Sequence, residues 1–216
     1  MKYKSRGLVL LGLLSLTLFS PAQGRTGEVA NWDFDVYLND KKVGKHLFTI
    51  SEVGGVKHVQ SEANFKHKIL FIPAYRYEHS AAERWSDNCL ITVDSSTNAN
   101  GKHSQISGEK TGVGFVIESG DNPVHLPECV MTFAYWNPDF LRESRLLNAQ
   151  TGDYVDVIVE EVGDELLEVR GQAVAATRFT LTAYEVDLTL WYSPDSEWLA
   201  LETVAKGGHI IRYELS

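Results

Sequence analysis

Apolar and polar residues alternate along much of this chain. Between Trp32 and Leu38 every second residue is apolar, so the four apolar side chains would share one face of an extended segment. A period of two is typical of a β-strand that buries one face. Similar runs recur and are separated by short turn sequences. The sequence therefore predicts about ten to twelve strands, joined in sequential antiparallel pairs.

Two glycine-containing turns are expected to set the register of their hairpins. Asn100-Gly101 is the strongest two-residue hairpin signal in the chain, because both central residues of a type I′ turn need a positive φ. Gly54-Gly55 predicts another hairpin. In that hairpin His46 would face Ala63, and no two histidines would pair across the strands.

Six further strands are predicted in the last third of the chain. The first two are expected to be separate strands joined by a turn at Val162–Asp164. The six predicted ranges are 154–161, 166–170, 173–183, 186–192, 197–205 and 209–215.

Residues 121–150 interrupt the series of predicted strands, and prolines recur through them. Between and after the prolines, Cys129–Trp136 and Asp139–Leu147 are predicted to form one or two short helices. Asp139 is a suitable helix start because it directly follows Pro138.

These elements predict a mainly β fold with a single β-rich domain over residues 28–216. A sheet of so many strands must curl, close or fold over. We expect one large, curved antiparallel meander, a half-closed barrel packed on the short helices. A closed barrel and a β-sandwich are the alternatives.

The first 22 residues have the three parts of a secretory signal peptide. Lys2, Lys4 and Arg6 are followed by the apolar run Gly7–Phe19, which is too short for a membrane-spanning helix of about 20 residues. Cleavage is expected after residue 22 or 24. No cysteine follows the apolar run, so a lipoprotein anchor is not expected. The predicted product is a soluble periplasmic or secreted bacterial protein without a transmembrane anchor.

The chain is acidic, with a formal net charge of −9 that becomes −12 when the signal peptide is removed. Such a surface repels nucleic acid and anionic lipid head groups. Nucleic acid is therefore not an expected partner. The sequence leaves the oligomeric state open.

Cys89 and Cys129 are the only cysteines. Cysteines of exported proteins commonly pair, and closing a loop of about 40 residues stabilises a fold by roughly 4 kcal/mol. We predict a disulfide between them. Two buried free thiols are one alternative, and a reactive thiol is another, although the chain has no C-x-x-C motif.

Motifs that carry chemistry are missing from the sequence. None of the seven histidines has the spacing of a metal site, and there is no nucleophile elbow or phosphate-binding loop. We therefore predict no catalytic residues, no metal and no cofactor. If the protein were a hydrolase, His125, Glu128 and Tyr135 near the irregular segment would be the first residues to inspect.

Aromatic residues are numerous, at 23 of 216. Ordinary core packing is the simpler interpretation. The functional alternative is a hydrophobic groove for an acyl chain or a similar ligand. The residues predicted to line such a groove are Tyr75, Tyr135, Trp136 and Trp191.

Several motifs resemble a family of uncharacterised secreted bacterial proteins of about 200 residues. The resemblance rests on Cys129–Pro138, Leu146–Gly152 and Leu190–Ser193, together with Phe34–Leu38 and Val43-Gly44. It covers most of the mature chain but implies no activity and no catalytic residues. The chain is more distantly similar to the periplasmic outer-membrane lipoprotein carriers, in which a curved antiparallel sheet wraps a helix.

From these observations we expect an exported module that binds or carries a hydrophobic or lipid-like ligand, and not an enzyme. A non-enzymatic structural or assembly factor of the cell envelope is the main alternative. Such a factor would act through an exposed apolar patch or an open sheet edge, without an interior cavity. A hydrolase of envelope material is the third hypothesis.

Overall fold

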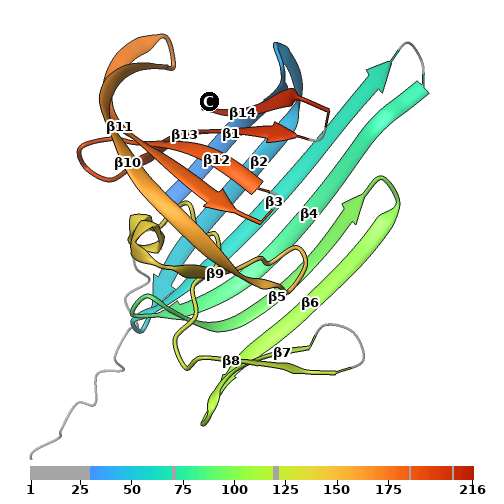
Figure 1. Ribbon diagram of the computed structural model, residues 1–216, viewed down its shortest axis with the longest axis vertical. Coiled ribbons are helices and arrows are strands. Elements are labelled where there is room, and N and C mark those ends of the chain that lie inside the picture. The colour runs from blue at the N-terminus through green and yellow to red at the C-terminus, as the bar shows by residue number, and fades with distance from the viewer. Residues whose placement is uncertain (1–29, 70–71, 119–121, 185, 206) are drawn as a thin grey trace, which may run out of the picture.

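In the computed structural model, most of the described residues belong to one long antiparallel sheet (Figure 1). The structure describes residues 30–69, 72–118, 122–184, 186–205 and 207–216. The fourteen strands formed by these residues are more than the predicted ten to twelve. The strands are β1 Ala30–Leu38, β2 Lys41–Val53, β3 Val56–Ile69, β4 Ile72–Ser86, β5 Cys89–Ala99, β6 Lys102–Thr111, β7 Gly114–Glu118, β8 Val124–Leu126, β9 Arg145–Leu147, β10 Tyr154–Val169, β11 Gln172–Ala183, β12 Val186–Tyr192, β13 Trp198–Ala205 and β14 His209–Leu215.

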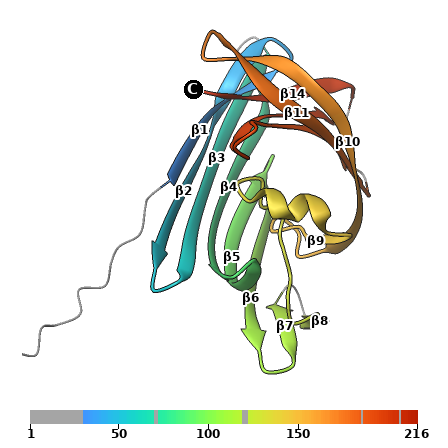
Figure 2. The same ribbon diagram turned by 90° about the vertical axis from the view of Figure 1, so that its left-hand side faces the viewer.

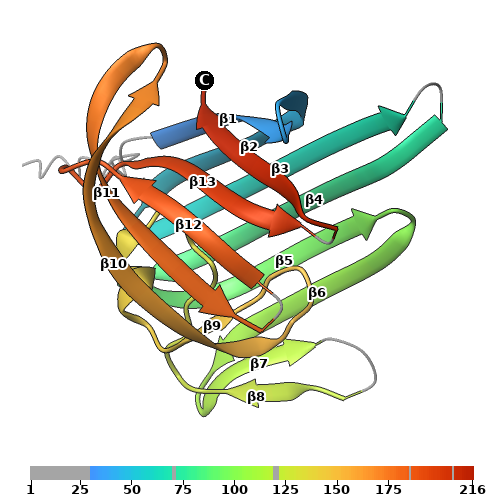
Figure 3. The ribbon, with the colours of Figure 1, turned by 45° about the horizontal axis from the view of Figure 1, so that its top comes forward.

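The order of the strands explains how the sheet curls. Strand β1 pairs with β14, so the first and last strands lie side by side near the middle of the sheet (Figure 3). The two sheet edges are β8 and β9, which are consecutive in the chain. The segment that joins these edges, residues 127–144, is called the inner segment and lies inside the curl (Figure 2). The mainly β, unclosed antiparallel sheet confirms this part of the fold prediction.

Both turn predictions are confirmed by the pairing. Gly54-Gly55 joins β2 to β3, and His46 pairs with Ala63 as expected. Asn100-Gly101 joins β5 to β6, and both residues have positive φ, at 54° and 86°. Local turn chemistry thus determines the register of these two hairpins.

The predicted helices at 129–136 and 139–147 are wrong. The only helix in the described part of this region is the 3-10 helix η1, Pro138–Arg142, which Asn137 caps by accepting a hydrogen bond from the Asp139 amide. Residues 145–147 form strand β9. The backbone bonds instead to the sheet. The amide of Leu90 donates to the carbonyl of Val130 at 3.0 Å. Pairing with neighbouring strands replaces the internal bonds that a helix would need.

The predicted turn at 162–164 is also wrong, because these residues belong to the single strand β10. The pairing with β11 shifts register between Glu161 and Gly163, which indicates a β-bulge. Gly163 adopts a φ of 133°, a conformation that suits glycine. A glycine within a strand pattern signals either a turn or a bulge, and here it forms a bulge.

Cys89 and Cys129 form a disulfide, as predicted. The bond joins the start of β5 to the inner segment, one residue away from the backbone bond between Leu90 and Val130. Among the described residues, no helix is long and apolar enough to cross a membrane. The predicted signal peptide, residues 1–22, and its cleavage site lie outside the described residues.

Candidate functional site

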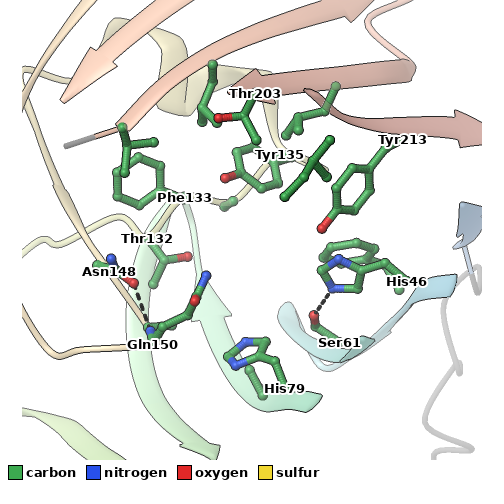
Figure 4. A pocket seen from close by; sticks show the side chains of 18 of the residues that line it. His46, Ser61, His79, Thr132, Phe133, Tyr135, Asn148, Gln150, Thr203 and Tyr213 are labelled. Carbon is green, nitrogen blue, oxygen red and sulfur yellow. Dashed lines mark hydrogen bonds between the residues drawn. The ribbon is translucent and has the colours of Figure 1, made fainter. Parts of the chain in front are cut away.

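A cavity of about 360 Å³ lies inside the curled sheet (Figure 4). Strands β2, β3 and β4 form one wall, and β12, β13 and β14 form the facing wall. Residues 132–136 of the inner segment and residues 148–150, between β9 and β10, contribute the rest of the lining. The volume is within the range of about 300–1,000 Å³ that is typical of small-molecule sites.

Strand β4 runs along the cavity from an open end to a closed end. Every second residue from Tyr75 to Glu83 lines it, as the alternation of a strand requires. Tyr75, Tyr77 and His79 are half-buried, whereas Glu83 is buried. At about 3.4 Å per residue this wall is about 27 Å long. Val204, 62% exposed, also lines the cavity, so the cavity reaches the surface.

The wall formed by β2, β3 and β4 carries hydrogen-bonding groups. His46, Ala63 and His79 are successive partners across these strands and therefore share one face. The Nε2 atom of His46 lies 2.7 Å from the Ser61 hydroxyl. The Nδ1 atom of His79 lies 2.9 Å from the Thr97 hydroxyl on β5. Two histidines thus line the same wall of the cavity, with Ala63 on the strand between them.

Both histidines are held in the neutral form. Burial, with a smaller contribution from His79, lowers the pKa of His46 to about 3. Burial also lowers the pKa of His79 to about 4. A buried imidazolium would lose its hydration without gaining a counter-charge. The Nδ1 atom of His46 is buried and has no hydrogen-bond partner among the described residues.

Glu83 is the one carboxylic acid among the described residues that line the cavity. It accepts a hydrogen bond of 2.9 Å from the indole Nε1 of Trp85. Burial raises the pKa of Glu83 to about 7, although bonds from Trp85 and Thr132 favour the carboxylate. Desolvation therefore outweighs the hydrogen bonds, and the group is partly protonated near neutral pH.

Tyrosines supply much of the remaining lining. Burial is the main cause that raises the pKa of Tyr77, Tyr135 and Tyr213, so these phenols stay uncharged. The ring of Tyr135 packs against Trp198, with 5.2 Å between ring centroids. The hydroxyl of Tyr192 donates a bond of 2.7 Å to the Tyr135 carbonyl. These contacts fix the inner segment against the sheet.

The facing wall is mostly apolar, with Leu188, Leu201 and Ile211 among its residues. Neither lysine nor arginine occurs among the described residues that line the cavity. The cavity is therefore amphipathic: one wall offers hydrogen-bonding groups, namely neutral histidines and tyrosines and the Glu83 carboxyl, and the other offers hydrocarbon. No lysine or arginine among the described residues lines it.

The structure brings together three of the four residues predicted to line a groove. Tyr75, Tyr135 and Trp136 line the cavity. Trp191 lies elsewhere, with its indole bonded to the Glu165 carboxylate at the exposed surface. Its neighbour Tyr192 points inward, because adjacent strand residues face opposite sides of a sheet.

The residues named for a hydrolase do not converge. His125 and Glu128 are exposed and do not line the cavity that contains Tyr135. Over the described parts of the chain, no group of three histidine, cysteine, aspartate or glutamate residues is placed to hold a metal ion.

His46, His79 and Glu83 were not predicted as cavity residues. The turn at Gly54-Gly55 places His46 opposite Ala63, but the connection between β3 and β4 has no glycine or asparagine from which their alignment could be predicted. The useful signal was the alternation along β4, in which Tyr75, Tyr77 and His79 occupy every second position. That pattern places them on one face with Glu83.

Comparison with known proteins identifies a family but no activity. Residues 34–216 match the family described as a domain of unknown function, DUF6134. No curated protein matches the chain. A similar solved structure is the β-barrel-like protein of domain of unknown function DUF1849 from Brucella abortus, with a TM-score of 0.63. That chain is 8% identical, and the match covers 87% of this chain and 94% of that one, so the likeness concerns the fold. This chain belongs to the DUF6134 family, whose function is unknown.

Proposed function

We propose that this protein is an exported, periplasmic or secreted, binding module whose cavity holds a hydrophobic or lipid-like ligand. The cavity of about 360 Å³ inside the sheet is the observation that carries the proposal. The disulfide between Cys89 and Cys129 is compatible with an oxidising compartment outside the cytoplasm.

The lining supports an apolar ligand on energetic grounds. Leu188, Leu201 and Ile211 on one side and the rings of Tyr75 and Tyr77 on the other offer apolar contact surface. Each methylene group that moves from water into such a site contributes about 0.8 kcal/mol. Because strands form both walls, the site exists before the ligand binds, and less binding energy is spent on ordering the chain.

The main alternative, an assembly factor that acts through its surface, needs no interior cavity. The cavity therefore favours the binding module. The hydrolase hypothesis has no support from the positions of His125, Glu128 and Tyr135, and it is not proposed.

Titration with a fluorescent acyl-chain probe tests the proposal, and adjacent alanines on β4 provide a matched pair of variants. Ala81 is buried and lines the cavity, whereas Ala82 is exposed on the opposite face. We expect Ala81→Phe to weaken probe binding at least tenfold, because the new ring occupies the ligand's space. We expect Ala82→Phe to bind like the wild type.

Circular dichroism of both variants verifies that they are folded before the comparison is made. Two results would contradict the proposal: no probe uptake by the wild-type protein, or an equal loss of binding in both variants.

A further inference from the structure

The cavity contains more polar groups than a site for pure hydrocarbon requires. His46 and His79 lie at inward-facing strand positions, where apolar side chains would complete the core (Figure 4). Glu83 occupies another such position on β4. Burying a polar group costs free energy unless it finds a hydrogen-bond partner. A ligand with its own polar group would recover that cost, whereas an alkane would not.

His46 has an unused hydrogen-bonding atom. Its side chain packs against Phe48, with 4.2 Å between ring centroids, and only 8% of the residue is exposed. One ring nitrogen is bonded to Ser61, and the other, Nδ1, has no partner among the described residues. The Nδ1 atom donates in one neutral tautomer and accepts in the other. Nδ1 is itself fully buried, so a ligand reaches it only when a neighbouring side chain shifts, and a group that both donates and accepts suits either tautomer.

The charges of the lining exclude one class of head group. Among the described lining residues no lysine or arginine is present, and both histidines are neutral at neutral pH. The residues that pack around Glu83 include Val59 on β3 and Val93 on β5, its partners in the sheet. A carboxylate or phosphate placed here would lose its hydration without meeting a positive charge.

We infer that the ligand is an amphiphile with an uncharged head group that donates and accepts hydrogen bonds, such as a hydroxyl or primary amide, and that the cavity rejects anionic head groups. This inference rests on the proposed function. The head group lies against the polar wall, where His46 and His79 lie across the sheet from each other and Glu83 lies four residues further along β4. The chain lies against Leu188, Leu201 and Ile211.

Competition between probes of equal chain length tests the inference. In this experiment four compounds compete separately, at pH 8, with a fluorescent acyl probe that is already bound to the protein. They are hexadecan-1-ol, monopalmitoylglycerol, palmitate and hexadecyl phosphate, each used below its aggregation concentration. We expect the two uncharged compounds to bind at least tenfold more tightly than the two anions. We expect Glu83→Gln to reduce this preference by weakening the repulsion, while Glu62→Gln, at an exposed position on β3, leaves it unchanged.

The outcomes separate this inference from the proposed function. If the anions compete as well as the uncharged compounds, the cavity binds lipid but the inference is wrong. If the preference survives in Glu83→Gln, the assigned role of Glu83 is wrong. If the protein takes up neither the fluorescent probe nor any of the four compounds, the proposed function itself fails.

Discussion

The two ends of the sheet's interior differ, although the same strands form both. At one end Trp85 and Trp198 of the sheet and Phe140 of the inner segment are fully buried. At the other end Tyr75 is half-buried and Val204 is exposed, and the space between the walls is a cavity. Strand β4 contributes Trp85 to the closed end and Tyr75 to the open end. Inward-facing alternation therefore produces a core only where the inner segment fills the space.

The largest expected effect is the difference in stability between these ends. Phe140→Ala should reduce the free energy of unfolding by about 3–5 kcal/mol, because it leaves a void among fully buried side chains. Tyr75→Ala should cost only about 1 kcal/mol, because the ring borders an existing cavity. Urea unfolding of both variants measures the difference. Equal losses would show that the two ends are packed alike.

The disulfide should stabilise the closed end by a similar amount. The double variant Cys89→Ala/Cys129→Ala should lose about 4 kcal/mol of unfolding free energy, because the bond closes a loop with a sequence separation of 40 residues. Adding a reductant to the wild-type protein should produce the same loss. A reduced protein as stable as the oxidised one would mean that backbone pairing alone holds the inner segment.

A smaller, pH-dependent effect is expected from Glu83 on the cavity wall. Its pKa is raised from 4.5 to about 7 in the folded state, so between these values the folded protein holds a proton that the unfolded chain has released. Its contribution to stability is therefore complete below pH 4.5 and is lost, by about 3 kcal/mol, as the pH rises to 7.

The lowered pKa values of His46 and His79 make the folded protein more stable as the pH rises, which is the opposite of the effect of Glu83. The measurement therefore compares the free energy of unfolding of the wild type with that of Glu83→Gln at each pH. Relative to this variant, the wild-type protein should become less stable by about 3 kcal/mol between pH 4.5 and 7.5. A constant difference between the two proteins would place Glu83 in contact with water.

Local signals predicted the sheet well and the interior poorly. Alternation and the turns at Gly54-Gly55 and Asn100-Gly101 depend on neighbouring residues, so the strands and two registers followed from the sequence. The inner segment depends on distant partners, such as the bond between Leu90 and Val130, and no local pattern encodes them. The two predicted helices failed for that reason.

The cavity lining shows the same division. Tyr75, Tyr135 and Trp136 were predicted as aromatic residues of a groove, and all three line the cavity. The pairing that aligns His46 with His79 requires the register of β3 against β4. The residues that connect those strands carry no turn signal, so the polar row across the cavity followed only from the structure.

Native mass spectrometry of protein purified from producing cells tests the central claim most directly. If the open end holds a ligand, the wild-type protein and Ala82→Phe should carry a small apolar adduct, and Ala81→Phe should not. Extraction of the same samples with organic solvent should recover an uncharged lipid from the first two alone. An adduct-free wild-type protein that also fails to take up added lipid would contradict the account.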